Sequence, residues 1–194
     1  MNMENLKSEI RNCTRCDLCR SRNHVIFGEG NEKADIMLIG EAPGAEEDRV
    51  GRPFIGTSGK LLDKILAACG FTREQHVFIS NIVRCRPPDN RVPMDTEVQS
   101  CIPYLFRQID LIDPKIIIPM GATALKRLLN DNAIKISKVR GCWLHLNERL
   151  VMPVYHPAAL LRNPNLKKDT WKDYKQIIAK YRELVDPNHH SDHA

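Results

Sequence analysis

Short runs of apolar residues recur along the chain, and each run is followed by glycine, proline or polar residues. Four runs have the length of buried strands: residues 36–39, a run that ends near residue 80, residues 116–119 and residues 150–155. Continuous apolar runs of this length are typical of parallel strands that are covered on both faces. The pattern therefore predicts a buried parallel sheet.

Between these runs the apolar residues follow a helical spacing, and a short N-terminal helix is expected around Leu6 and Ile10. Four longer amphipathic segments follow, at residues 58–69, 98–112, 122–129 and 168–185. Ser58 is the expected N-cap of the first segment and Gly70 its C-terminal stop. Pro103 is expected to bend the second segment or to mark its first turn. Strands that alternate with helices predict an α/β fold with helices on both faces of the sheet.

Length and composition fit one globular domain. The 194 residues are enough to bury a substantial core, and we expect a domain at residues 1–185 followed by a disordered tail at residues 186–194. No apolar run approaches the ~20 residues of a membrane span, and the first residues lack the apolar core of a signal peptide. We therefore expect a soluble, cytoplasmic protein with no membrane partner. A net charge of +5 mildly favours a polyanionic partner.

The cysteines change this picture, because an odd count of seven without a secretion signal argues for a metal or cluster site rather than a disulfide framework. Four of them are candidate ligands: Cys13, Cys16, Cys85 and Cys101. Cys19 competes for the third position, whereas Cys69 and Cys142 lie on patterns that predict packing. Zinc and an iron–sulfur cluster both accept four thiolates. The long second spacing is unlike a compact zinc finger but does not exclude zinc.

The stretch from residue 40 to residue 59 carries much of the remaining candidate chemistry. It follows a strand end, reads GEAPGAEEDRVGRPFIGTSG, and combines glycines, carboxylates and one aromatic residue. Ligands of open α/β sheets bind just beyond the carboxyl ends of the strands. Glycines let backbone come close to a ligand, and carboxylates act as acids or bases. An ordinary βα loop has a similar composition, so this stretch alone leaves both interpretations open.

Motifs at three strand ends become specific when they are taken together. They are GEAPG at residues 40–44, Asn81 after the second strand, and HPAAL at residues 156–160. With CxxC at residues 13–16 and CRPP at residues 85–88, this arrangement closely resembles the family 4 uracil-DNA glycosylases of bacteria and archaea. The resemblance covers nearly the whole chain, and it rests on the order and spacing of motifs that are weak individually.

The resemblance implies a fold, a reaction and a cofactor. The fold is a three-layer α/β/α sandwich around a central four-stranded parallel sheet. The reaction is the hydrolytic removal of uracil from single- or double-stranded DNA by a monomeric enzyme, which leaves an abasic site and begins base excision repair. The cofactor is a 4Fe–4S cluster, whose ligands match Cys13, Cys16, Cys85 and Cys101. Cys19 falls in the family pattern but is not taken as a ligand.

The same resemblance implies roles for residues in a uracil pocket. Phe54 matches the aromatic residue that stacks on the extruded base, Asn81 the amide that reads its edge, and His156 the histidine of the second catalytic motif. The expected pocket lining also includes Gly40, Glu41 and Ala42, with Glu47 beside the base. Ala42 stands where family 1 enzymes carry an aspartate that positions the attacking water. The general base is therefore open between Glu41 and Glu47, and we favour Glu47.

These side chains suit the reaction on chemical grounds as well. A base inside a duplex must be flipped out before an enzyme can act on it, and an aromatic ring such as that of Phe54 can stack on the flipped base. An Asn81 amide donates to uracil O4 and accepts from N3–H, and a His156 donor stabilises the charge that moves onto O2 as the bond breaks. Each residue could also have a purely structural role. Asn81 would then cap a turn, His156 would form a hydrogen bond within the fold, and Phe54 would pack in the core.

Basic residues flank the motifs and are candidates for phosphate contacts. They are Arg84, Arg86 and Arg91 on the loop that contains Cys85, and Arg162, Lys167 and Lys168 after HPAAL. We take Arg86, Arg162 and Lys168 as the DNA-binding residues. Leu160 is the expected wedge that fills the gap left by the flipped nucleotide. A solvated surface and an ordinary helix start are the respective structural alternatives.

Two other functions compete with excision. One is a nucleic-acid-binding iron–sulfur protein without glycosylase activity. The other is a relative that forms a covalent adduct with uracil-containing DNA, which carries a basic, histidine-containing insertion after the second strand. The corresponding stretch here reads CRPPDNRVP and contains no histidine. Release of free uracil without cross-linking distinguishes excision from both alternatives.

Overall fold

A computed structural model describes residues 2–192, and within them the strands form one sheet in the order β1-β3-β2-β4-β6-β5. The strands are β1 (Glu29–Gly30), β2 (Ile36–Gly40), β3 (Val77–Asn81), β4 (Ile116–Pro119), β5 (Leu144–Leu146) and β6 (Arg149–Val151). The four central strands, β3-β2-β4-β6, pair in parallel, whereas the edge strands β1 and β5 pair antiparallel to their neighbours. The expected four-stranded parallel sheet is therefore confirmed, and two short antiparallel edges extend it.

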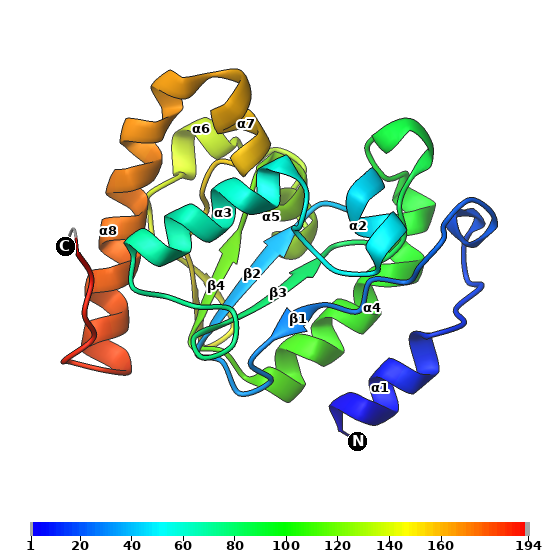
Figure 1. The fold of residues 1–194 in the computed structure, drawn as a ribbon, viewed down its shortest axis with the longest axis horizontal. Helices are drawn as coiled ribbons and strands as arrows, with labels where there is room; N and C mark the ends of the chain where they lie inside the picture. The colour runs from blue at the N-terminus through cyan, green and yellow to red at the C-terminus, as the bar shows by residue number, and fades with distance from the viewer. Residues whose placement is uncertain (1, 193–194) are drawn as a thin grey trace.

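Helices cover both faces of this sheet, as the alternation of strands and helices predicts (Figure 1). The α-helices are α1 (Met3–Ile10), α2 (Ala45–Val50), α3 (Thr57–Ala68), α4 (Asp95–Ile112), α5 (Ala122–Leu129), α6 (Ile136–Val139), α7 (Pro157–Arg162) and α8 (Lys167–Leu184). Single 3-10 turns are η1 (Asp17–Arg20), η2 (Pro88–Asn90) and η3 (Pro164–Leu166). Across residues 2–192, none of the helices has the length and apolar character that crossing a membrane requires.

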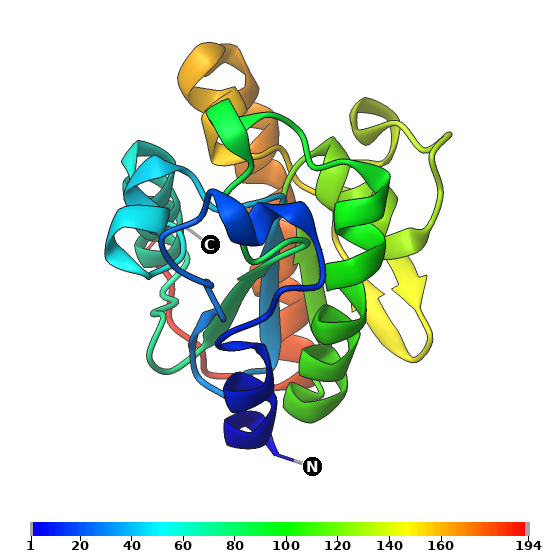
Figure 2. The same ribbon diagram turned by 90° about the vertical axis from the view of Figure 1, so that its right-hand side faces the viewer.

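The alternation of side chains along β2 shows why three layers form. Met37 and Ile39 join one buried cluster with residues of α1, α4 and α5, whereas Ile36 and Leu38 join a second cluster with residues of α3 and α8. Successive residues of a strand point to opposite faces, so a strand that is apolar throughout needs a helical layer on each side. The two views of the fold show these layers on either side of the sheet (Figures 1 and 2). The three-layer α/β/α sandwich is thus confirmed.

Three local features differ from the sequence-based expectations. Helix α3 begins at Thr57 with Gly56 at its N-cap, so Ser58 lies inside the helix and does not cap it. Helix α4 runs through Pro103 without a break and begins at Asp95, because the Glu97 carboxylate accepts a hydrogen bond from the Met94 amide (2.8 Å) and fixes the helix start well before the proline. Helix α2 lies inside the stretch that was expected to be a loop.

The C-terminal residues pack against the domain, where the sequence predicted a disordered tail. The imidazole Nε2 of His189 lies 2.8 Å from the Cys69 carbonyl oxygen, and the ring stacks on Phe71 with centroids 4.6 Å apart. Ser191 Oγ donates to the Ala68 carbonyl (3.0 Å). Ring stacking and capping of the C-terminal carbonyls of α3 explain the difference, because both stabilise the tail in place. Residues 193 and 194 of the expected tail lie outside the described residues.

Candidate active site and candidate metal centre

A cavity of about 650 Å³ opens at the carboxyl ends of the central strands. Its lining includes Glu41, Ala42, Glu47, Phe54, Asn81, Asn90, Arg91, Tyr155, His156 and Arg162. Gly40 pairs with Asn81 across β2 and β3, and Met120 after β4 bridges Val154, two residues before His156. Parallel pairing therefore brings the three motif-bearing strand ends to one edge of the sheet.

Asn81 presents an unpaired acceptor at this cavity. Its side chain is 2% exposed, and no group among residues 2–192 donates a hydrogen bond to Oδ1. Gly40 makes the arrangement possible, since a Cβ there would lie 2.4 Å from Asn81 Oδ1 and 2.6 Å from Phe54 Cζ. A buried amide oxygen without a partner costs about 1–3 kcal/mol, so a donor from a ligand or a water molecule at this oxygen would be favourable.

His156 is held as a neutral donor. Its Nδ1 accepts a hydrogen bond from the Ala158 amide (3.0 Å) at the start of α7, so the ring proton of the neutral form is on Nε2. The pKa of His156 is lowered to about 4, mainly by burial and less by the nearby Arg162, while Glu47 opposes the shift. At neutral pH the imidazole therefore carries no charge and has one N–H to offer.

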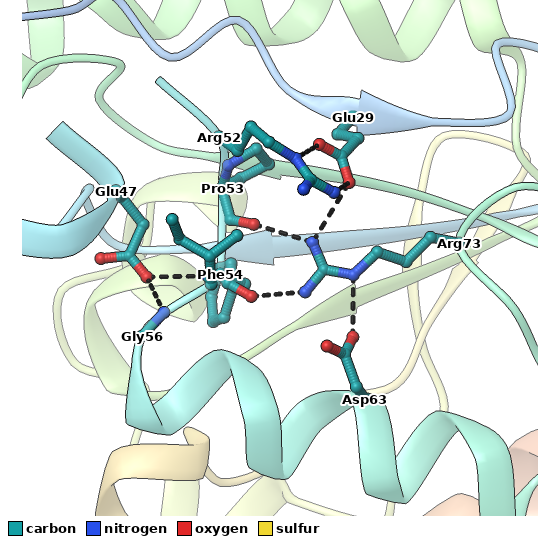
Figure 3. A network of polar contacts seen from close by, with 9 residues as sticks. Glu29, Glu47, Arg52, Pro53, Phe54, Gly56, Asp63 and Arg73 are labelled. Carbon is teal, nitrogen blue, oxygen red and sulfur yellow. Dashed lines mark hydrogen bonds and ion pairs between the residues drawn. The ribbon is translucent and has the colours of Figure 1, made fainter. Parts of the chain in front are cut away.

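Phe54 forms the aromatic wall next to His156, with ring centroids 5.6 Å apart and planes 35° from parallel. Its backbone lies in the left-handed region (φ 52°), which costs a residue with a side chain on the order of 1–3 kcal/mol. Arg73 donates hydrogen bonds to the Pro53 carbonyl (2.8 Å) and to the Phe54 carbonyl (Figure 3). Hydrogen bonds from a charged donor contribute about 1.5–3 kcal/mol each, which is enough to offset this strain.

The two carboxylates expected near the base lie at the cavity in different settings. Glu47 Oε1 accepts hydrogen bonds from the Ile55 and Gly56 amides, both at 2.9 Å, and so ties α2 to the turn that carries Phe54 (Figure 3). Glu41 and Ala42 line the cavity, whereas Gly40 is outside the lining and leaves room for Asn81 and Phe54. Glu47 therefore has one oxygen engaged in the fold and the other, Oε2, without a protein donor in the described part of the chain.

The expected DNA-binding residues are spread around and beyond the cavity. Arg162 is exposed and lines it, whereas Lys168 is exposed at the start of α8, outside the lining. Arg86 is half-buried, and its Nε donates to Asn90 Oδ1 (2.8 Å). Leu160 is only 1% exposed and packs inward, in contrast to its neighbour Leu161, which is 43% exposed.

The sequence patterns did not indicate every residue that contributes to the cavity. Asn90, from the loop after Cys85, lines the cavity although no motif marks it, and Arg91, which the sequence indicated only as a candidate phosphate contact, lines the cavity as well. Tyr155 is adjacent to His156, and its position beside a motif residue was a signal that could have been used. Arg73 is one arginine in a polar loop, and only the fold shows that it touches the Phe54 turn.

Cys13, Cys16, Cys85 and Cys101 line a second, smaller pocket, and Cys19 does not. Burial raises the pKa of the Cys85 thiol to about 12, against a smaller opposing effect of Arg22. Cys69 is buried as expected, whereas Cys142 is exposed, contrary to the packing pattern. The four cysteines that match the expected ligands therefore come from three distant segments of the chain and line one pocket.

Two arginines supply positive charge to this cysteine pocket. Arg22 Nη1 lies 3.4 Å from Cys85 Sγ, and Arg84 Nη1 lies 3.8 Å from Cys101 Sγ. Arg84 is 1% exposed and forms no ion pair with a carboxylate among residues 2–192, so it was wrongly counted as a candidate for DNA contact. A buried cation requires a negative partner, and ligated thiolates provide one. The residues present therefore fit an anionic metal–thiolate group.

The comparisons with known proteins agree with this geometry. A family model for the uracil DNA glycosylase superfamily matches residues 27–177. A type-4 uracil-DNA glycosylase of Sulfurisphaera tokodaii is 46% identical, with 94% of this chain and 84% of the relative covered. The chain belongs to the type-4 uracil-DNA glycosylases. Other members of this family are similar to it, among them those of Saccharolobus solfataricus (44% identical; 91% and 85% covered) and Thermotoga maritima (43%; 83% and 84%).

The tautomer and charge of His156 in this type-4 glycosylase can be tested directly. At pH 7 the ¹⁵N chemical shifts of the imidazole should report a proton on Nε2 and none on Nδ1, because Nδ1 accepts from Ala158. The ring should gain its second proton, and with it a positive charge, only as the pH falls through about 4. Titration near 6.5, the value of an unperturbed histidine, would contradict the assignment.

Proposed function

We propose that the protein excises uracil from DNA by hydrolysing the N-glycosidic bond, which releases free uracil and leaves an abasic site as the first step of base excision repair. The observation that carries this conclusion is the meeting of three groups at one cavity: the unpaired Asn81 oxygen, the Phe54 ring and the neutral His156 donor. Membership of the type-4 family supports the same reaction.

Asn81 is the proposed reader of the base. Uracil N3–H supplies the donor that Oδ1 lacks, and the Asn81 amide nitrogen donates to uracil O4. Cytosine has no proton on N3 and carries an amino group in place of O4. The Asn81 oxygen would then face the lone pair of N3, and the Asn81 amide N–H would face another donor. Unpaired buried polar groups are a strong source of discrimination between substrates.

Phe54 is the proposed platform for the flipped base. Extrusion of a nucleotide costs a few kcal/mol, and base–aromatic stacking contributes roughly 1–3 kcal/mol. The ring next to His156 holds the base with one edge toward Asn81 and the other toward the imidazole. Stacking thus both offsets the cost of flipping and orients the base.

His156 is the proposed stabiliser of the leaving group. A water oxygen forms a bond to C1′ while the C1′–N1 bond breaks, and the electron pair of that bond stays on uracil, where charge collects on O2. The Nε2–H of neutral His156 donates to this oxygen. The free Oε2 of Glu47 is the favoured acceptor for the proton of the water, with Glu41 as the alternative at the same cavity.

The four cysteines are proposed to hold a 4Fe–4S cluster. Membership of the type-4 family supports this assignment, and so do the Arg22 and Arg84 guanidinium groups that lie beside the Cys85 and Cys101 sulfurs. When bound, the cluster would join the three segments that carry the four cysteines and so stabilise the irregular loops between them. Because Cys85 and Cys101 flank the loop that carries Asn90 and Arg91, we assign it a structural role at the cavity.

DNA, single- or double-stranded, is the proposed partner of a monomeric, cytoplasmic enzyme. Arg162, Lys168 and Arg86 are proposed to contact phosphates. Leu161 replaces Leu160 as the proposed wedge, because it is the exposed member of the pair. An iron–sulfur protein that only binds DNA would not need the His156 donor. A covalent adduct would need a nucleophile at the base, and CRPPDNRVP lacks the basic, histidine-containing insertion of the covalent relatives.

The function is tested by incubating the purified protein with a uracil-containing oligonucleotide and measuring free uracil, abasic sites and cross-linked product. We expect uracil and abasic sites without cross-links. His156→Ala should lower the single-turnover rate about 10²–10³-fold with little loss of DNA affinity, as for removal of one oxyanion donor. Asn81→Ala should reduce the rate and weaken discrimination against cytosine. Wild-type single-turnover cleavage by His156→Ala would rule out the leaving-group role.

The metal centre is tested on protein purified without oxygen. We expect brown protein that contains iron and sulfide, and we expect Cys85→Ser to lose both and to expose the loop at residues 86–94 to proteolysis, since ligation fixes this chain. Cys142→Ser is the matched control and should retain iron, because Cys142 is exposed and outside the pocket. Colourless protein with stoichiometric zinc would disprove the cluster.

The wedge is tested by comparing two adjacent leucines on two substrates. Leu161→Ala should reduce turnover on duplex DNA more than on single strands, where no base stack must be opened, and should leave the melting temperature nearly unchanged because the side chain is exposed. Leu160→Ala should lower stability by about 2–5 kcal/mol, the usual cost for a buried leucine. Equal losses on both substrates for Leu161→Ala would remove the wedge role.

A further inference from the structure

Arg73 lies outside the cavity, yet it contacts the backbone that carries the aromatic wall. The side chain is almost fully buried, and all three guanidinium nitrogens donate hydrogen bonds (Figure 3). Nε donates to Asp63 Oδ1 (2.8 Å), Nη1 to the Pro53 carbonyl (2.8 Å), and Nη2 to the Phe54 carbonyl. Nη1 also lies 3.5 Å from Glu29 Oε1. Arg73 thus joins the Phe54 turn to α3 and to β1.

The Pro53 and Phe54 carbonyls depend on Arg73 for a hydrogen-bond donor. Helix α3 packs directly under the Phe54 carbonyl, since a Cβ at Gly59 would lie 1.8 Å from that oxygen. A carbonyl enclosed in this way needs a donor from the protein. The planar guanidinium offers two parallel donors to adjacent carbonyls, whereas a lysine ammonium acts as a single point.

The turn is held from its other side by a side chain of opposite charge. Glu47 accepts the amides of Ile55 and Gly56, immediately after the two carbonyls bound by Arg73. Two carbonyls and two amides of residues 53–56 are therefore bound by one acceptor from α2 and one donor from the loop before β3 (Figure 3). Together these contacts determine where the left-handed Phe54 backbone directs its ring.

We propose that Arg73 is a positioning residue for uracil excision. By binding the Pro53 and Phe54 carbonyls, it holds the Phe54 ring in the place where it stacks on the flipped base beside His156. Arg73 touches neither the base nor the reacting atoms, so its effect passes through Phe54. The inference rests on the stacking role proposed for Phe54.

The test compares Arg73→Met with Arg52→Met. Both arginines contact Glu29, and each variant removes one positive charge, but Arg52 is exposed and binds neither carbonyl. We expect Arg73→Met to lower the single-turnover rate about tenfold or more, since small misplacements of a binding group are costly. Arg52→Met should stay within about twofold of the wild type, as exposed ion pairs contribute little.

A second arm separates positioning from general destabilisation. In a Phe54→Ala background the ring is absent. Adding Arg73→Met to this variant should therefore lower its single-turnover rate by less than about twofold. Hydrogen exchange at the Ile55 and Gly56 amides should accelerate in Arg73→Met and not in Arg52→Met, at a temperature where both variants are folded. If Arg73→Met does not fold, Arg73→Lys replaces it, because it keeps the charge and loses the paired donors.

Three results would overturn the inference: equal rates for Arg73→Met and Arg52→Met, the same fold loss with and without the Phe54 ring, or unchanged exchange at Ile55 and Gly56. A wild-type rate for Phe54→Ala would instead contradict the proposed stacking role, together with any positioning that acts through the ring. The Ile55 and Gly56 amides donate to Glu47 and not to the ring, so their exchange distinguishes this failure from a failure of Arg73 to hold the turn.

Discussion

Parallel pairing of β2 with its two neighbours is the constraint on which the rest of the site depends. Gly40 pairs with Asn81 on one side, and β4 pairs with both β2 and β6, so the motif-bearing strand ends reach the same edge of the sheet. The backbone hydrogen bonds of the sheet hold each strand end in place. The side chains just beyond these ends are therefore rigidly positioned and face the cavity. Asn81 and His156 therefore line one cavity, although they follow different strands of the sheet.

Buried arginines link this edge to the surrounding loops. Arg84 places positive charge beside Cys101, and Arg73 donates to the turn that carries Phe54. A guanidinium suits both tasks, since it stays charged and directs several donors from one plane. The loop between Cys85 and Cys101 contributes Arg91 to the cavity, where its neighbour Glu97 holds it through two hydrogen bonds of 2.6 and 2.9 Å. The loop between Cys85 and Cys101 thus connects the cysteine pocket to the cavity at the strand ends.

Apolar periodicity was sufficient to predict the parallel strands and the two helical layers, because burial on both faces leaves a strong pattern in the sequence. Motif order then placed Asn81, His156 and the four cysteines. Helix α2 was missed because its polar residues give no apolar stripe, and Asp48 buries itself by accepting the Asn23 and His24 amides rather than through hydrophobic contact. Such long-range polar contacts leave no period in the sequence.

The direction in which a side chain points was the other feature that the sequence could not predict. Leu160 and Leu161 are identical in type and adjacent, and only the packing of α7 decides which one is exposed. Arg73 likewise looks like any surface arginine until the fold brings Pro53 and Phe54 to it, about twenty residues away in sequence. Sequence patterns specify elements and motif positions, whereas the partners of single polar residues depend on tertiary packing.

The central claim is that one base occupies the cavity between Asn81, Phe54 and His156. A crystal structure of the protein with free uracil tests it most directly. We predict a uracil ring stacked on Phe54, with N3 within about 2.7–3.2 Å of Asn81 Oδ1 and O2 at a similar distance from His156 Nε2. Uracil bound elsewhere, or bound in the cavity with Asn81 Oδ1 still unpaired, would contradict the account.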